Sequence, residues 1–352
     1  MGFLTKYGSY WGTVPPTTGN IYFVAPGAGS YTLAGPQGIR TYPASDNNDG
    51  LSPERALATI NRAWDLVTAN AGDVIVLLAG THSASAGTIT CDVAGVTMLG
   101  VGHRFDGVSE LTSPKTVIQG ATSGGGGLND DLINVTASDT EIGYLELRPT
   151  QGFDAICFET ESALDGLYFH HLKLEMTIPD ATTKTRGINF GHRAARSGSD
   201  YGLMGSIATA TLWATIEDLY AISDGAMGPA IEFATCYAIV RRAKFDLTTS
   251  ATWASPVRVA TRVRNSTMQD CVWVSAGIMG QCIDGTDSDA GPLQASGMTL
   301  VDCTFTGNLT AVNKPVDGFT LSGTSSLFSQ IAYGRGVQVA TATAGSTVGL
   351  VT

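Results

Sequence analysis

The sequence predicts an all-β solenoid, in which short parallel strands stack in successive coils around one continuous core. The first observation is a repeated pattern in which apolar and polar residues alternate around a small or thiol residue. It is clearest at 268–274 and returns at 298–306, with a spacing of 32 residues from Cys271 to Cys303. Looser copies lie at 142–147, 216–222 and 239–245. Each copy is too short to bury its own apolar face, so neighbouring copies must cover one another.

The second observation is the composition of the 352 residues. Charged residues make up only 14% of the chain, below the usual value of about a quarter, whereas hydrophobic residues make up 43%. The 43 glycines and the abundance of Val, Ile, Thr and Ser favour many short strands joined by tight turns. The net charge of −11 argues against a nucleic-acid partner.

The third observation is the spacing of apolar pairs that we expect to open successive coils. These pairs begin 23, 32, 43, 26 and 26 residues apart, at Ile133, Ile156, Ile188, Ile231, Val257 and Ile283. A basic coil of about 23 to 26 residues with insertions explains this spacing. The longest insertions, 176–187 and 191–211, should project from one face, where ligands usually bind. His192, Arg193 and Arg196 are therefore candidate ligand-binding residues.

Residues 1–45 are expected to form an irregular N-terminal arm, rich in Gly, Pro and aromatic residues. A cluster of exposed aromatic rings marks an interaction site, so the arm should pack against something. Two interpretations stay open: the arm packs on the body of its own chain, or it anchors the chain to a larger assembly. The anchoring interpretation rests on the rings of Tyr7, Tyr10, Trp11, Tyr22 and Phe23.

The next segment combines a turn with the start of a helix. Residues 46–50 form a turn cluster, Ser52 is a good N-cap and Pro53 suits the first helical position. We expect a helix over 52–69 with one apolar stripe, formed by Leu57, Ile60, Trp64 and Val67. The turn lacks the acidic spacing of a calcium loop, so a turn and helix-cap role is expected and no metal site.

This segment and the strand after it resemble the N-terminal cap of right-handed parallel β-helix proteins of the pectate-lyase-like kind. The match covers the Asp-Asn-Asn-Asp-Gly turn at 46–50, the capping helix, the strand at 74–78 and the Gly-Thr-His turn at 80–82. That group includes many phage tailspikes and other virion surface proteins. The resemblance implies a right-handed parallel β-helix over 46–322 and a homotrimer. The repeated pattern changes after about residue 310, so we expect a last half-coil at 311–321 and a C-terminal β tail at 323–352 that caps the open end or contacts other subunits. It says little about activity.

Enzymes of this group cleave polysaccharides with paired carboxylates, sometimes with a calcium ion and an arginine base. Asp218, Asp270 and Asp302 occupy one position of the repeated pattern, and Arg242 takes that position in the copy at 239–245. They are the candidate catalytic residues, but the solvated face of a solenoid gives the same pattern, so a non-catalytic surface is favoured and a polysaccharide lyase or glycoside hydrolase stays open. His170 and His171 are expected to point to opposite faces of a strand, and so not to share a site.

Other signals of chemistry are weak. The six cysteines form no C-x-x-C motif, which disfavours a zinc site, and those within apolar strands are expected to be buried. No cofactor motif, signal peptide or membrane-spanning run is found. The large aromatic residues in the predicted coils look scattered rather than grouped into a sugar-binding groove, with Trp273 directed inward: Trp213, Tyr237, Trp253 and Trp273.

These observations favour a structural protein of the bacteriophage virion surface: a capsid decoration protein, head fibre or spike. Such a protein would be made in the host cytoplasm, and its partners would be copies of itself and other virion proteins, chiefly the capsid. The first alternative is a tailspike that binds or depolymerises a host surface polysaccharide. The second is a free polysaccharide lyase or hydrolase, which would normally need an export signal.

Overall fold

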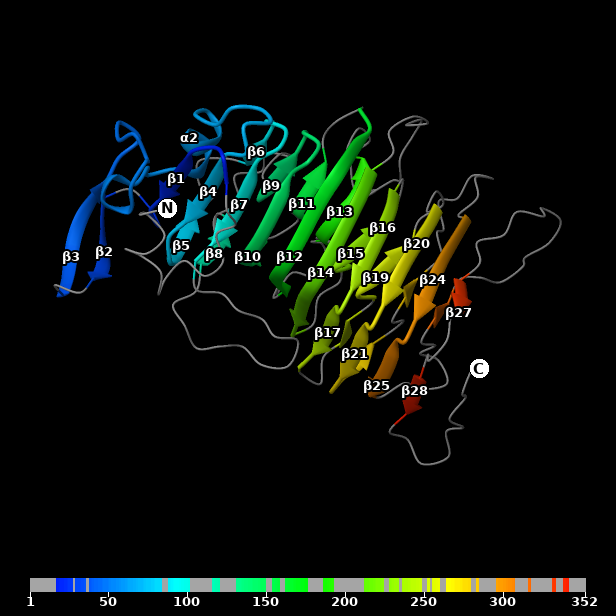
Figure 1. Cartoon of the computed structure of the whole chain (residues 1–352). Coiled ribbons are helices and arrows are strands. Elements are labelled where there is room, and N and C mark those ends of the chain that lie inside the picture. Colours follow the sequence, from blue (N-terminus) through cyan, green and yellow to red (C-terminus); the bar gives the residue numbers. More distant parts are fainter. Residues whose placement is uncertain are drawn as a thin grey trace, which may run out of the picture.

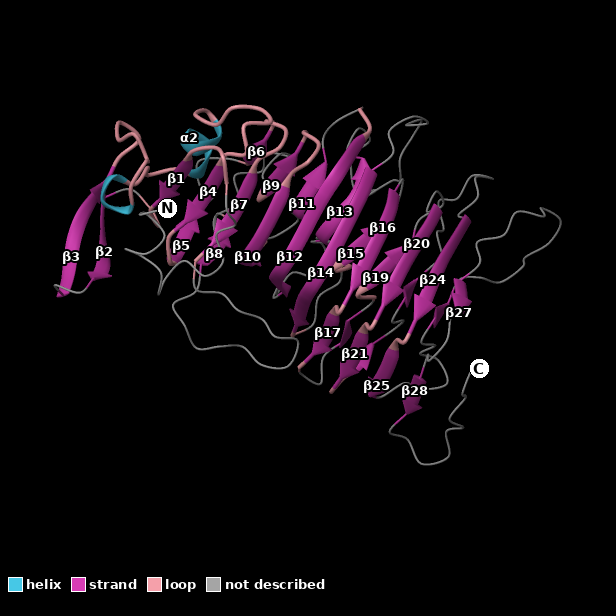
Figure 2. Cartoon of the chain, in the orientation of Figure 1, coloured by secondary structure: helices cyan, strands magenta, loops and turns pink. Residues whose placement is uncertain are grey.

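A computed structural model of the chain forms an all-β solenoid of stacked parallel strands, a parallel β-helix (Figure 1). The structure describes residues 17–27, 29–35, 38–83, 88–101, 116–120, 131–149, 154–158, 162–176, 186–192, 212–224, 228–233, 236–248, 252–253, 255–259, 264–279, 283–284, 296–307, 316–317, 331–333 and 338–341. Strands dominate these residues, and the helical segments gather at one end of the stack (Figure 2).

Three strand layers run the length of the solenoid, and their strands pair in parallel with the coils before and after. The first layer contains β1 (Ile21–Val24), β4 (Val74–Leu77), β7 (Thr97–Gly100), β10 (Glu141–Arg148), β12 (Leu164–Met176), β14 (Leu212–Ser223), β16 (Cys236–Arg241), β20 (Arg264–Gln269), β24 (Ser296–Val301) and β27 (Ile331–Tyr333). The second contains β5 (Gly80–Ser83), β8 (Thr116–Gln119), the second halves of β10, β12 and β14, then β17 (Lys244–Leu247), β21 (Val272–Ser275), β25 (Thr304–Gly307) and β28 (Gln338–Thr341). The third contains β6 (Ile89–Cys91), β9 (Ile133–Val135), β11 (Asp154–Phe158), β13 (Arg186–His192), β15 (Ile231–Phe233), β19 (Val257–Val259), β23 (Ile283–Asp284) and β26 (Val316–Asp317).

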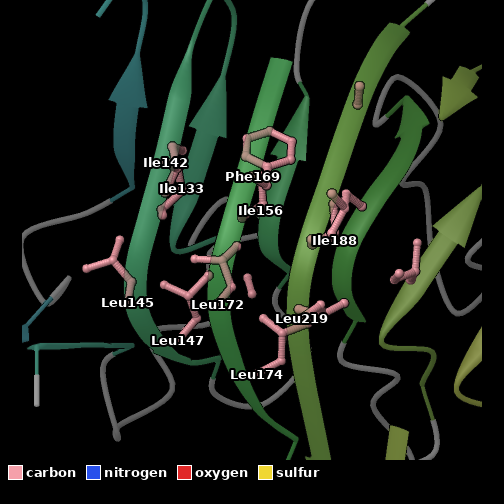
Figure 3. Close-up of a cluster of buried hydrophobic side chains, with 14 of the residues drawn as sticks. Ile133, Ile142, Leu145, Leu147, Ile156, Phe169, Leu172, Leu174, Ile188 and Leu219 are labelled. Carbon is pink, nitrogen blue, oxygen red and sulfur yellow. The ribbon is translucent and has the colours of Figure 1, made fainter. Parts of the chain in front are cut away.

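The core is built from columns of apolar side chains that repeat from coil to coil. The third layer contributes the column predicted from the sequence, in register from Ile133 through Ile156, Ile188, Ile231 and Val257 to Ile283. Figure 3 shows part of this column facing apolar residues of the other two layers. Burying each such side chain stabilises the fold by about 1.5–3 kcal/mol, so the stacked columns supply the main driving force.

The N-terminal cap differs from the expected helix over 52–69. The chain forms a 3-10 turn, η1 (Pro53–Arg55), and a separate short α-helix, α2 (Ile60–Trp64). Between them, Leu57 bridges to Val24 in extended geometry, which interrupts any continuous helix. The N-cap of α2 is Thr59, whose hydroxyl accepts from the amide of Arg62, whereas the expected cap, Ser52, makes no side-chain capping bond. The turn supports this cap, because the carboxylate of Asp46 accepts bonds from the amides of Ala58 and Thr59 and from the Thr59 hydroxyl.

The N-terminal region joins the body earlier than expected. β1 pairs with β4, which moves the start of the solenoid from residue 46 to residue 21. Tyr22 and Phe23 are buried, at 8% and 2% exposure, so these two rings pack on the body of their own chain. A hairpin follows, β2 (Gly29–Gly35) and β3 (Gly38–Ala44), and packs Tyr31 against the outer side of the first coils. Tyr7, Tyr10 and Trp11 lie outside the described residues.

At the other end, the chain continues the stack beyond the predicted boundary at residue 322. β26 extends the third layer, as expected for a last partial coil. β27 then pairs with β24, and β28 pairs with β25, so the tail adds one more strand to each of the other layers. Among the described residues, no helix is long and apolar enough to cross a membrane.

Candidate functional site

The corner between the first and second layers carries a ladder of outward residues. Six residues at this corner have a positive φ, between 50° and 57°, and we call them the corner ladder: Tyr144, His171, Asp218, Arg242, Asp270 and Asp302. Flanking strand pairs place them in one column, one residue per coil. The sequence-based prediction that Asp218, Arg242, Asp270 and Asp302 share one position is therefore confirmed, and two aromatic members extend the column.

The left-handed conformation explains why the chain turns here. It costs an ordinary residue roughly 1–2 kcal/mol, and Asp, Asn and His accept it most readily. Backbone bonds offset part of that cost, since the amides of Arg242 and Asp270 donate to carbonyls of the next coil at 3.0 Å. The positive φ also breaks the two-residue alternation of a strand, so neighbouring side chains on both sides of the corner can face solvent together.

Arg242 lies at the centre of an ion-pair network. Its Nε and Nη2 atoms donate to both oxygens of Asp218, at 2.7 and 2.9 Å, and Nη2 also reaches Oε2 of Glu217 at 3.2 Å. Glu217 accepts further bonds from Arg241 at 3.0 Å and from the Tyr168 hydroxyl at 3.1 Å. Each carboxylate is thus held by a guanidinium of the next coil, an arrangement that fixes the stacking of β14 on β16.

The network shifts the titration of its members. Partial burial disfavours the charge on Glu217, but bonds from Arg241, Tyr168 and Arg242 outweigh it and lower the pKa of the carboxyl. Burial and the bond to Glu217 raise the pKa of Tyr168 to about 12. The bonds to Asp218 hold the pKa of Arg242 above its usual value. The lowered pKa of Glu217 and its ion pairs with two guanidinium groups suit a structural lock better than a proton donor.

His170 and His171 lie side by side, which corrects the expectation that they face opposite sides of the strand. Their Nδ1 atoms are 3.0 Å apart, because the positive φ of His171 returns its ring to the outer face. Tyr144 stacks on His171 at 4.5 Å, and Tyr168 stacks on His170 at 4.6 Å. Gly143 lies beside His170 in the neighbouring coil, and any Cβ there would overlap the imidazole ring.

Each histidine also faces a carboxylate through its other ring nitrogen. Nε2 of His170 lies 2.9 Å from Oε1 of Glu141, and Nε2 of His171 lies 3.6 Å from Oδ2 of Asp218. Burial lowers the pKa of His171, and His170 and Arg242 add to this effect against the opposing Asp218. The site therefore links five consecutive strands, from Thr97 on β7, which donates to Glu141 at 3.0 Å, to Arg241 on β16.

A second carboxylate pair lies on the outer side of the second layer. Nε of Arg148 contacts both Glu146, at 2.6 Å, and Glu175, at 3.0 Å, while Lys173 lies 3.7 Å from Glu146. Burial opposes ionisation of Glu146, but Glu175, Lys173 and Arg148 lower its pKa to about 2. Burial and the hydrogen bond to Glu146 raise the pKa of Glu175, against the opposing charges of Arg148 and Lys173.

This pair is poorly suited to glycoside hydrolysis. Glu146 has a fully buried side chain, and the two carboxyls are hydrogen-bonded, whereas glycosidases keep theirs at least about 5 Å apart. The sequence signal that could have found the pair is Glu-x-Arg at 146–148 beside Lys-x-Glu at 173–175, since these segments pair in register.

The remaining predicted site residues are not brought together. Asp270 and Asp302 are exposed corner residues one coil apart, beyond the Arg242 network. His192 is the last residue of β13 rather than part of a loop, while Arg193 and Arg196 lie outside the described residues. Within the described ranges, no group of three or more His, Cys, Asp or Glu side chains could hold a metal ion.

An aromatic pair that looked scattered in the sequence is assembled by the fold. Trp213 on β14 and Tyr237 on β16 are neighbours in register, and their rings stack in parallel at 4.0 Å with an interplanar angle of 7°. Trp213 is 50% exposed, and Ile239, two residues beyond Tyr237, is 39% exposed. The pair shares the outer face of β14 and β16 with Glu217, so aromatic and charged groups are adjacent.

Comparisons with known proteins give little beyond this geometry. No protein-family model matches the chain, and no curated protein matches it. A solved structure described as Geobacillus virus E2 ORF18 aligns with 82% of this chain at 12% identity and a TM-score of 0.32. The aligned part spans 59% of that viral chain, and a likeness this loose carries no argument about function. The class that the structure defines is a parallel β-helix with a charged and aromatic outer face.

Proposed function

We propose that this chain is a structural protein of the bacteriophage virion surface, as a capsid decoration protein, head fibre or spike. The observation that carries the proposal is the ion-pair network around Arg242, in which arginines pair with the carboxylates of the corner. The groups best suited to catalysis, Glu217 and Asp218, are bound by Arg241 and Arg242 of the next coil and so reinforce the stack. The resemblance of the sequence to virion surface proteins supports the proposed location on a phage particle.

Purified particles of the virus that carries this coding sequence test the proposal. An antibody raised against the isolated chain should label intact particles, and mass spectrometry should find the chain in them at high copy number. Particles without the chain would contradict the proposal.

The anchoring role of the arm is tested with a chain lacking residues 1–16, because a longer deletion would remove β1 from the sheet. This shorter chain should fold normally and fail to rebind particles.

A second candidate function is binding of a host surface polysaccharide, favoured by the exposed Trp213–Tyr237 stack. Aromatic faces beside hydrogen-bonding side chains are common in ligand sites. Trp213→Ala should abolish retention on an immobilised polysaccharide from the host envelope. Ile39→Ala is the matched control, since Ile39 is 75% exposed on the distant hairpin. This function would be contradicted if both variants were retained equally on the polysaccharide, or if the unaltered chain were not retained at all.

Cleavage is tested in the same experiment. If the corner ladder were catalytic, the unaltered chain would release oligosaccharides and Asp218→Asn would stop that release without loss of folding. We expect no release from either protein, because Arg242 holds Asp218 through two bonds. Release that depends on Asp218, Asp270 or Asp302 would instead support a depolymerase.

A further inference from the structure

We propose that His170 and His171 form a single proton-binding dyad, which holds one shared proton, locks three coils together, and opens when a second proton binds. The proposal concerns the stability of this corner and does not depend on the proposed function. It rests on a continuous chain of contacts, from Glu141 on β10 through His170 and His171 on β12 to Asp218 on β14.

The three contacts of this chain determine how many protons it needs. They join Oε1 of Glu141 to Nε2 of His170 at 2.9 Å, the two Nδ1 atoms at 3.0 Å, and Nε2 of His171 to Oδ2 of Asp218 at 3.6 Å. A carboxylate can only accept, so the hydrogen bond to Glu141 needs an N–H from His170. The contact between His171 and Asp218 is longer than a hydrogen bond, and it is attractive only when Nε2 of His171 carries a proton. The central contact needs one N–H and one bare nitrogen.

Counting N–H groups selects one charge state. A neutral imidazole carries one N–H and an imidazolium carries two. Two neutral rings supply two protons for three contacts, which leaves one contact without a donor. One neutral and one charged ring supply three, so every contact is satisfied. Two charged rings supply four, and then two N–H groups face each other across the 3.0 Å between the Nδ1 atoms of His170 and His171.

The surroundings favour the first proton and oppose the second. Glu141 and Asp218 face the outer nitrogens, and Glu217 lies beside Asp218 with its charge held by Arg242. Two carboxylates therefore attract the first charge. Burial, His170 and Arg242 all lower the pKa of His171, and these effects oppose a second charge.

Stacking transmits the change to the neighbouring coils. Tyr144 stacks on His171 at 4.5 Å and meets the edge of His170 at 5.0 Å, so it packs against both rings. Tyr168 stacks on His170 at 4.6 Å and donates a hydrogen bond to Glu217. When the two N–H groups repel, His171 must turn away because it is the more exposed ring, at 28%. That movement removes the Tyr144 stack and loosens the corner of β12.

The test is a titration of the full chain with ring-labelled histidine, followed by nuclear magnetic resonance from pH 8 to pH 4. The signals of His170 and His171 should move together in a first step, with a second step at least about one pH unit lower, as expected for a strongly coupled pair. In His171→Asn, His170 should titrate in a single step. Asparagine suits the variant because it accepts a positive φ and does not titrate.

His82 is the internal control. It is buried on β5, contacts the carbonyl of Leu78 at 2.8 Å, and should behave identically in both proteins. The proposal is overturned if His170 and His171 titrate with one common midpoint, or if His170 titrates in the same way in His171→Asn.

Amide hydrogen exchange of β12 at pH 4 tests the opening of the corner. Protection should fall about tenfold more in the unaltered chain than in His171→Asn. Equal protection would overturn the opening step.

Discussion

At the residue scale, the corner ladder shows what a repeated pattern can and cannot reveal. Asp218, Asp270 and Asp302 were predictable because their local sequences are nearly copies. Tyr144 was missed although it lies in the looser copy at 142–147, because an aromatic residue stands there in place of a charged one. His171 was missed because its segment was not among the copies. The contact between His170 and His171 was missed for another reason: a two-residue period assumes extended backbone, and a positive φ at a non-glycine residue leaves no clear signal in the sequence.

The bidentate pair of Arg242 gives the first prediction. Arg242→Ala should lower the free energy of unfolding by about 1 kcal/mol, since the side chain is half exposed and solvent weakens such pairs. Arg55→Ala is the matched control, because Arg55 makes a more exposed ion pair with Asp49 at 2.9 Å, and should change stability by less than about 0.5 kcal/mol. Urea unfolding of both variants measures the difference. Equal effects would show that the Arg242 pairs do not stabilise the stack.

The buried carboxyl of Glu146 gives a prediction about pH. Its pKa of about 2 in the folded chain lies below the ordinary value of 4.5, because Glu175, Lys173 and Arg148 overcome the effect of burial. Ionised Glu146 therefore stabilises the fold above pH 4.5, and this contribution is lost as the pH falls toward 2. Glu146→Gln should destabilise the chain by about 2 kcal/mol at pH 7 and by less at pH 3.

Urea unfolding at pH 7 and pH 3 checks this prediction. Asp92→Asn serves as the control, because Asp92 is exposed and its substitution should have a small effect at both values. A loss of stability in Glu146→Gln that is the same at pH 3 as at pH 7 would contradict the low pKa of Glu146.

The buried thiols give a further prediction at this scale. Burial raises the pKa of Cys91 and of Cys271 well above the usual value, and the thiolate is the reactive form. Both residues should therefore remain unmodified when the native chain is treated with iodoacetamide at pH 8, and both should react after unfolding in urea. Peptide mass spectrometry distinguishes the two states, and rapid native alkylation of Cys271 would contradict its burial.

At the scale of elements, strands were predicted better than helices. The starts of the third-layer strands follow from Ile and Phe pairs that face the core, and their register is confirmed over six coils. The expected helix over 52–69 had good capping residues and an apolar stripe. Pairing of Leu57 with Val24 overrode that local preference, because contacts with a distant strand are not encoded in helical periodicity.

The turn before α2 gives the prediction for this scale. Asp46 accepts three hydrogen bonds that fix the chain at the helix start, at 3.0, 2.9 and 2.9 Å. Asp46→Ala should cost about 2 kcal/mol of stability, since two backbone amides and one hydroxyl lose their acceptor. Asp49→Ala is the control, since Asp49 accepts one longer hydrogen bond, at 3.2 Å from Leu51, and makes one exposed ion pair with Arg55, and it should cost clearly less. Equal losses in urea unfolding would contradict the role of Asp46 in fixing the chain before α2.

At the scale of the whole molecule, the core sets the register whatever the length of the insertions between coils. The strands that begin with Ile188 and Ile231 are 43 residues apart in the sequence, and they pair in register as well as the strands of Ile133 and Ile156, which are 23 residues apart. This is why the stack was predictable from apolar spacing alone. The Trp213–Tyr237 pair was not, because an outward residue finds its neighbour only after the register of two complete coils is known.

The central claim is this in-register stack, and a distance measurement tests it most directly. Thr97 and Thr299 belong to one outer column, joined by six successive strand pairs through Glu141, Tyr168, Thr215, Ile239 and Thr267. Six steps of about 4.8 Å predict a backbone separation of roughly 29 Å. Spin labels on Thr97→Cys and Thr299→Cys, in a chain with Cys236→Ser and Cys282→Ser, report this distance by pulsed electron resonance.

A single narrow distribution near 30 Å is the expected result, allowing a few ångströms for the labels. Chains with one label at a time control for reaction of the native thiols and for contact between molecules. A distance beyond about 40 Å, or below about 20 Å, would mean that the coils do not stack in this register. The corner ladder and the histidine dyad would then not exist as described, and the structural role proposed for the chain would lose its basis.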